Sequence, residues 1–218
     1  MITLRRRESP LVFVLFPMLH LGTDAFYQEV DERLRHCEVV VAEGVGGRSV
    51  IIAALTLAYR LPGRRRRLGL VKQHIDLAGL GVPVIRPDMT AGEFRQGWRA
   101  VPVLQRTVVV CLAPAVAVAF WLVGTRRMLA RYANLDDLPD QIQSQVRDQA
   151  GELEDLLVDR RDGLLVSALD TIHGEHRTEP MTVAVVYGAG HMPAVVHHLA
   201  GRYGYRPREA QWLTVFDF

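Results

Sequence analysis

The chain has 218 residues, 49% of them apolar, and a formal net charge of only +2. This length and composition predict a folded domain with a large core and exclude a disordered chain. Lys72 is the single lysine among 26 basic residues, and no recognised nucleic-acid-binding module accompanies the arginines, so we expect no nucleic-acid partner. Cys37 and Cys111 form no CxxC motif, which indicates reduced thiols in a cytoplasmic protein.

The first part of the chain, to about Asp88, alternates strand and helix patterns. Apolar, β-branched runs predict three strands, and amphipathic or apolar stretches between them predict two helices. The strands are expected at 11–19, 38–42 and 82–85, and the helices at 24–35 and 49–59. This alternation favours an α/β fold with a parallel sheet. The arginine run 64–67 then reads as a solvated loop or as a contact with anionic lipid.

A stretch without any charged residue, 107–124, lies in the middle of the chain between clusters of arginine. Its length makes it a marginal membrane span, and Pro114 at its centre would interrupt a helix. Three interpretations stay open: a helix buried in the protein or in a homo-oligomer interface, a hairpin inserted in a membrane, or a true span. A single span would separate the two halves of the chain across the membrane.

The last third predicts a long amphipathic helix over 138–171, or two helices joined near Gly163, with a leucine stripe as the apolar face. A β-branched strand from Val183 then leads through a glycine-rich turn into a further helix. The segment 212–216 predicts a final strand. His173 and His176 flank Gly174 and precede Pro180, which favours a solvated loop there.

Two histidines follow apolar strands at opposite ends of the chain, His20 and His191. Ligands of open α/β sheets bind at the carboxyl ends of the strands, so these histidines are expected to share one site. Glu43 ends a buried strand and needs a partner or water. Asp88 also follows a strand, although Thr90 and Glu93 form a capping box that would give this segment a purely structural role.

These motifs resemble the TraB family, which includes the PrgY and GumN proteins and shares its fold with Tiki metalloproteases and erythromycin esterase. The resemblance covers most of the chain. It rests on a late GxxH motif, 188–191, on the strand-end Glu43 in VVVAE, and on Arg161 in the helical sequence DRRD. The first motif of this chain reads PMLH, with Pro17 where the family has glycine.

The resemblance implies a single domain over 1–218, with a mixed sheet, flanking helices and an apolar helical insertion at about 101–131. It implies that His20, His191 and Glu43 bind a divalent metal (Zn, Mn, Fe or Co) and that Arg161 binds a carboxylate or an oxyanion. If Glu43 is instead the general base, Asp88 would complete the metal site. The expected function is hydrolysis of a peptide or ester bond in a peptide or small-molecule substrate. The alternative is a non-catalytic binding protein, possibly in contact with a membrane through 107–124.

Overall fold

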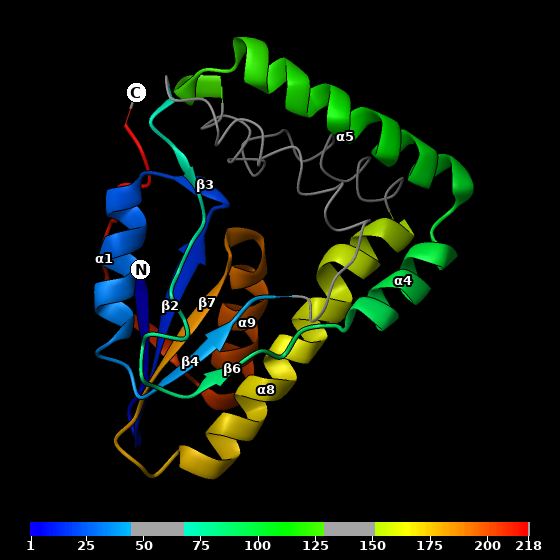
Figure 1. The fold of residues 1–218 in the computed structure, drawn as a ribbon. Helices are drawn as coiled ribbons and strands as arrows, with labels where there is room; N and C mark the ends of the chain where they lie inside the picture. The colour runs from blue at the N-terminus through cyan, green and yellow to red at the C-terminus, as the bar shows by residue number, and fades with distance from the viewer. Residues whose placement is uncertain (45–67, 129–150, 218) are drawn as a thin grey trace.

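The computed structural model describes residues 1–44, 68–128 and 151–217 (Figure 1). The helix expected at 49–59, the arginine run 64–67 and the start of the helix expected at 138–171 lie outside these residues. The described part is a mixed α/β fold, as expected, and helices cover both faces of a central sheet.

Six strands form the central sheet in the order β6-β4-β7-β2-β1-β8. In chain order these are β1 (Ile2–Arg6), β2 (Ser9–Met18), β4 (Val39–Ala42), β6 (Val84–Ile85), β7 (Thr182–Gly188) and β8 (Arg206–Ala210). The four strands from β6 to β2 are parallel, whereas β1 pairs antiparallel with both β2 and β8. The carboxyl ends of the four parallel strands therefore meet at one edge of the sheet.

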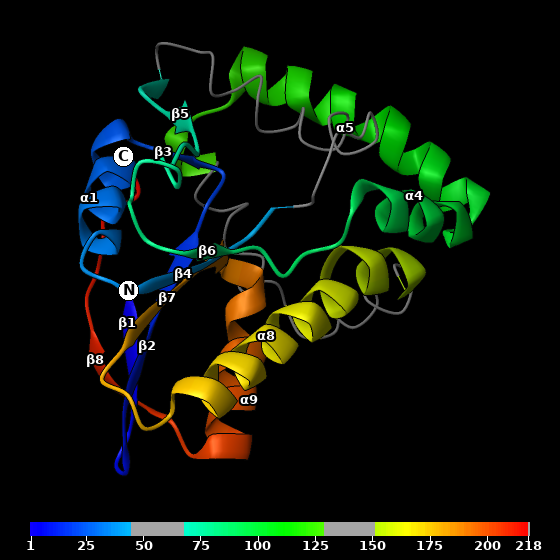
Figure 2. The same cartoon turned by 60° about the horizontal axis from the view of Figure 1, so that its bottom comes forward.

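Strands β2, β4 and β7 are apolar on both faces because each face is covered by helices. Helix α1 (Asp24–Leu34) covers one face, and helices α8 (Arg160–His176) and α9 (Met192–Tyr203) cover the other (Figure 2). Within β2 the neighbours Phe13 and Val14 pack into opposite layers, as the period of two along a strand requires. A smaller ladder joins β3 (Leu21–Gly22) to β5 (Val71–Lys72).

The charge-free stretch of the sequence forms one helix, α5 (Val103–Val123), which contains Pro114 in its interior. The hairpin interpretation of this stretch is therefore wrong. Helix α4 (Ala91–Ala100) precedes α5 and begins with the expected capping box, in which Thr90 and Glu93 bond each other's backbone N–H groups. The two helices lie to one side of the sheet (Figure 1), and α5 falls within the insertion expected at about 101–131.

Helix α8 runs through Gly163 without a break, in agreement with the alternative of one continuous helix there. Two local expectations are corrected by tertiary packing. His173 is a buried residue of that helix, not part of a solvated loop: its ring packs against Tyr203 and lies within hydrogen-bond distance of the Tyr205 hydroxyl, at 3.2 Å. The final strand is β8 and not 212–216, because residues 206–210 pair antiparallel with the side of β1 that faces away from β2.

Candidate active site

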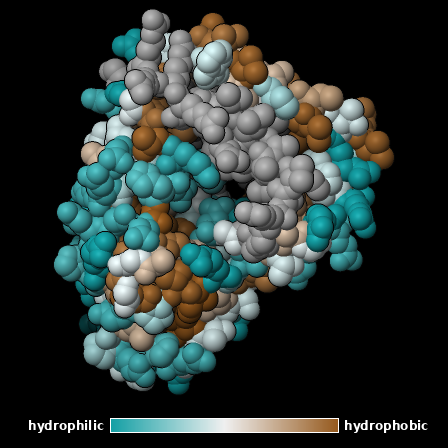
Figure 3. All heavy atoms as spheres, in the orientation of Figure 1, coloured by the Kyte–Doolittle hydropathy of each residue, from teal (hydrophilic) through white to brown (hydrophobic). Residues whose placement is uncertain are grey.

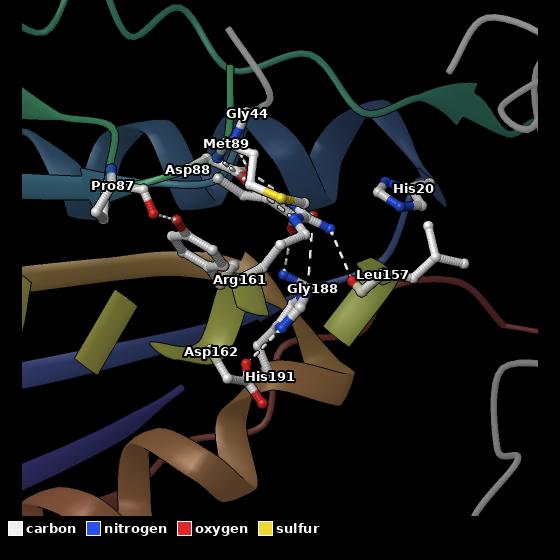
Figure 4. A network of polar contacts seen from close by, with 12 residues as sticks. His20, Gly44, Pro87, Asp88, Met89, Leu157, Arg161, Asp162, Gly188 and His191 are labelled. Carbon is white, nitrogen blue, oxygen red and sulfur yellow. Dashed lines mark hydrogen bonds and ion pairs between the residues drawn. The ribbon is translucent and has the colours of Figure 1, made fainter. Parts of the chain in front are cut away.

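Acidic residues and a histidine gather where the parallel strands end (Figure 4). Glu43 follows β4, Asp88 follows β6, and His191 ends the short 3-10 turn η5 (Ala189–His191) that follows β7. Strand β4 lies between β6 and β7 in the sheet. The three side chains are therefore neighbours, although up to 148 residues separate Glu43 from His191 along the chain.

Arg161 of helix α8 lies at the centre of the group. Its Nε and Nη2 donate to the two oxygens of Asp88 at 2.9 and 2.7 Å, and Nη2 also donates to Oε1 of Glu43 at 2.6 Å. The side chain of Asp88 is fully buried, and that of Arg161 is 12% exposed. Arg160, its neighbour in the sequence, instead pairs with Asp155 at the surface.

A single turn of π-helix, η4 (Asp155–Asp159), leads directly into α8. Such turns inside α-helices are frequent at functional sites because they rotate the following residues. Here the Leu157 carbonyl of the π-turn accepts a long hydrogen bond from Arg161 Nη1, at 3.4 Å. The backbone of the turn thus takes part in holding the guanidinium against the sheet edge.

Each strand-end carboxylate also accepts a hydrogen bond from the backbone at or just beyond the end of the next strand. Asp88 accepts from the N–H of Gly44 at 3.0 Å, and Glu43 accepts from the N–H of Gly188 at 2.7 Å. Because β4 lies between β6 and β7, these two hydrogen bonds connect the ends of three neighbouring strands. A side chain at Gly188 would place its Cβ only 3.2 Å from the Glu43 carboxylate, so glycine permits this close approach.

The electrostatics keep both carboxylates ionised. Burial by itself would raise the pKa of Glu43, but attraction and hydrogen bonding to Arg161, the Gly188 N–H and His191 outweigh it and hold that pKa below its ordinary value. The pKa of Asp88 is lowered in the same way, burial being outweighed by Arg161 and two backbone N–H groups. The pKa of Arg161 is raised despite its burial, because both carboxylates favour its charged form.

His191 lies between two carboxylates. Its Nδ1 is 2.6 Å from Oδ1 of Asp162, and its Nε2 is 3.9 Å from Oε1 of Glu43. The ring also packs edge-on against Tyr187, whose hydroxyl donates to the Pro87 carbonyl. Contacts on three sides therefore fix the orientation of the imidazole.

His20 does not join this group as expected. It is exposed, and its Nδ1 lies 3.3 Å from the side-chain carbonyl of Gln73. Figure 4 shows its ring to one side of Arg161 and apart from His191. Strands β2 and β7 do end side by side, with Met18 opposite Gly188, but His20 lies two residues beyond its strand in a bend that turns the ring away.

Asp88 is also unsuited to the expected role of metal ligand. Its two oxygens accept four hydrogen bonds, from Arg161 twice and from the N–H groups of Met89 and Gly44. Arg161 is engaged by Asp88 and Glu43, so its guanidinium holds the site together and is not directed at a substrate oxyanion.

Asp162 and Tyr187 were missed as site residues in the sequence. Asp162 follows Arg161 directly, but adjacency in a helix is no signal, because consecutive side chains point about 100° apart and Arg160, on the other side of Arg161, lies at the surface. Tyr187 alternates inward along β7 with other core residues, and nothing distinguishes it from them in sequence.

The described residues contain no group of three or more His, Cys, Asp or Glu side chains arranged to hold a metal ion. Comparison of the chain with models of protein families, with curated proteins and with solved structures gives no match. What the site does must therefore be argued from its own geometry.

Proposed function

We propose that the chain is a hydrolase of peptide or ester bonds in which His191 transfers the proton. The observation that carries the proposal is the position of His191 between Asp162 and Glu43. An Nδ1–H that donates to Asp162 leaves the lone pair on Nε2. A carboxylate that orients an imidazole in this way is the arrangement with which hydrolases activate a hydroxyl group or water.

The charges around His191 support such a role. The group contains three carboxylates, two paired with the guanidinium of Arg161 (Glu43 and Asp88) and one with His191 (Asp162). Three negative charges and one positive charge leave two negative charges when His191 is neutral. An imidazolium formed when Nε2 accepts a proton would be stabilised by Asp162 and by Glu43. In this scheme Glu43 is the electrostatic partner of His191, and Arg161 positions Glu43.

The other half of the reaction needs stabilisation of a negatively charged oxygen. Helix α9 begins directly after His191, and its N-terminal turn therefore lies at the same sheet edge. The positive end of a helix dipole favours negative charge. At this end of α9 the Met192 N–H donates to the Ala189 carbonyl and Pro193 has no N–H, so the contribution is that of the dipole. We assign stabilisation of the developing oxyanion to this end of α9 instead of to Arg161.

The metal implied by the family resemblance requires a separate test of fit. Two ligands of a tetrahedral zinc ion lie about 3.4 Å apart, and the 3.9 Å between His191 Nε2 and Glu43 Oε1 is close to that distance. Catalytic zinc, however, takes three protein ligands, and no third one accompanies this pair among the described residues. The described donors do not make a complete metal site, and no step is assigned to a metal.

Hydrolysis of p-nitrophenyl esters and of a fluorogenic peptide mixture tests the proposal. We expect the wild type to be active and His191→Ala to lose about 10²-fold or more in kcat. The matched control is His198→Ala, since His198 also pairs with an aspartate, Asp170, at 2.6 Å but outside the site. Equal losses in both variants, or a wild type without turnover, would refute the proposal.

Asp162→Asn tests the positioning role of Asp162, with Asp170→Asn as its control. Because the amide cannot stabilise the imidazolium, we expect a fall in kcat together with an altered pH profile, and little change in KM. Metal analysis of the same preparations, with and without added Zn, Mn, Fe or Co, decides whether turnover depends on metal.

The alternative function is binding of a peptide or small molecule without catalysis. The outward position of His20 and the full engagement of Asp88 and Arg161 favour it. It predicts that a ligand stabilises the wild type and His191→Ala against unfolding while neither variant turns over substrate.

We also infer a cytoplasmic location with contact to a membrane. Cys37 is buried and Cys111 is an exposed free thiol, which suits a reducing compartment. Among the described residues, α5 is the one helix long and apolar enough to cross a membrane.

A further inference from the structure

Helix α5 exposes a broad apolar surface. Only 7% of its most apolar 18-residue window is buried, and hydrophobic side chains line the rim of the molecule where α5 lies (Figure 3). We define the outer face of α5 by its exposed large apolar residues: Val103, Leu104, Val108, Val110, Leu112, Val118, Trp121, Leu122 and Val123. So large an exposed patch marks an interaction surface.

Both ends of α5 are attached to the same body. Near its start, Val109 packs against the cluster formed by α4 and η4, which includes Trp98 and Leu156. Just beyond its end, Arg126 donates to the Leu68 carbonyl at 2.7 Å and to Asp217 at 2.7 Å. The helix therefore lies alongside the domain, on the side toward which the parallel strands run (Figure 1).

The outer face is too wide for the narrow seam by which two helices pair. Trp121, Leu122 and Val123 are consecutive, and all three are at least 44% exposed. At about 100° per residue they cover about 200° of the helix circumference, whereas a helix pair buries a strip of a and d positions. A lipid phase, in contrast, covers any width of apolar surface.

The charges next to α5 complement an anionic membrane surface. Between Glu93 and Asp136 the sequence has six arginines and no acidic residue. Arg99 precedes the helix and Arg127 follows it, and both are exposed. Arginine beside an apolar helix contacts lipid phosphates, and tryptophan near a helix end, as at Trp121, prefers the interface.

We propose that α5 lies in the plane of an anionic bilayer, with its outer face embedded at the boundary of headgroups and acyl chains and its flanking arginines on the phosphates. Because both ends are bound to one body, the helix does not cross the bilayer in this fold. The domain is thereby held on one side of the membrane, with the arginines at both helix ends on that side.

Flotation with vesicles tests the proposal on the full chain. We expect the wild type to float with vesicles of phosphatidylcholine and phosphatidylglycerol. Leu112→Asp with Leu122→Asp should weaken binding by about tenfold or more, because the carboxylates would enter the acyl boundary. The matched control, Leu164→Asp, changes an exposed leucine of α8 and should bind as the wild type does. A wild type that stays with the soluble fraction overturns the proposal.

The arginines and the orientation have their own measurements. Arg99→Gln and Arg127→Gln should each weaken binding about fivefold on phosphatidylglycerol vesicles and have little effect on pure phosphatidylcholine. In a chain with Cys37→Ala and Cys111→Ala, the exposed positions on either side of α5 take the label: Ala100→Cys and Thr125→Cys should both react with an impermeant maleimide added outside the vesicles. Labelling of one end alone would mean a span and would overturn the in-plane arrangement.

The competing occupant of the outer face is a second copy of the chain. Light scattering during size exclusion without lipid identifies it. A wild type that is dimeric, becomes monomeric in the Leu112→Asp and Leu122→Asp variant, and does not float would overturn the membrane proposal. A wild type that floats, with binding lost in this variant, supports it.

Discussion

Replacing Arg161 by methionine removes the guanidinium but keeps a side chain of similar length. The wild-type arginine makes three short bonds to Asp88 and Glu43, and the Asp88 side chain has no exposed surface. Removing one partner of a buried ion pair costs about 3–5 kcal/mol. Backbone N–H groups still bond both carboxylates in the variant, so we expect the lower end, a loss of about 3 kcal/mol in the free energy of unfolding.

The loss in the free energy of unfolding caused by Arg161→Met should become smaller at acidic pH. The pKa values of Glu43 and Asp88 are lowered in the folded wild type. Their contribution to stability is therefore complete above the unfolded values, about 3.9 to 4.3, and disappears as the pH falls through the lowered folded values. In the variant, burial without Arg161 favours the protonated carboxyl groups. The difference in the free energy of unfolding between the wild type and Arg161→Met should therefore decrease as the pH falls below about 4.

Urea unfolding of Arg161→Met at neutral pH, repeated at acidic pH, measures both effects. Arg160→Met is the control, since its guanidinium bonds Asp155 at 2.6 Å with both side chains largely in water; it should cost less than about 1 kcal/mol. If Arg161→Met lies within about 1 kcal/mol of the wild type, or if the two variants lose the same amount, the reasoning about the buried pair is wrong.

Two further predictions concern glycines. A Cβ at Gly97 would overlap the Leu156 side chain, so Gly97→Ala should cost about 1–3 kcal/mol in urea unfolding. Gly92→Ala, where contact distances stay ordinary, should be neutral or stabilising. Gly204 ends α9 with φ +75°, so Gly204→Ala should lower the free energy of unfolding by about 1 kcal/mol, whereas Gly201→Ala inside α9, where a Cβ meets open space, should raise it by up to about 1 kcal/mol. If Gly92→Ala destabilised the protein more than Gly97→Ala, or Gly201→Ala more than Gly204→Ala, the result would contradict the packing and backbone geometry described above.

Much of the fold could be predicted because the strongest sequence signals coincide with the strongest physical constraints. The buried parallel strands are continuous apolar runs, and strand ends of a parallel sheet must meet at one edge. This was enough to place Glu43 near His191, and the resemblance added Arg161. The distances of 2.6 Å from Arg161 to Glu43 and 3.9 Å from His191 to Glu43 agree with that expectation. The proposed catalytic roles remain predictions.

The rest depends on contacts that local sequence does not contain. His20 lies in a bend after its strand, and its Nδ1 is close to the side chain of Gln73, 53 residues away in the sequence. His173 is buried because Tyr203 and Tyr205 of a later segment cover it, which the neighbouring glycine cannot indicate. Strands β1 and β8 are short and rich in arginine, so only their pairing identifies them.

The hydrogen bonds from the Gly44 N–H to Asp88 and from the Gly188 N–H to Glu43 predict a pattern in mutational surveys of the chain. These carboxylates extend the hydrogen bonding of the sheet beyond its last residue pairs, so we expect them to stabilise the fold whatever the reaction is. A selection for cellular abundance alone should retain Glu43 and Asp88 as strictly as a selection for activity. His191 and Asp162 should vary under selection for abundance and be retained only under selection for activity. The comparison would distinguish residues that stabilise the fold from residues that act in the reaction, without knowledge of the substrate.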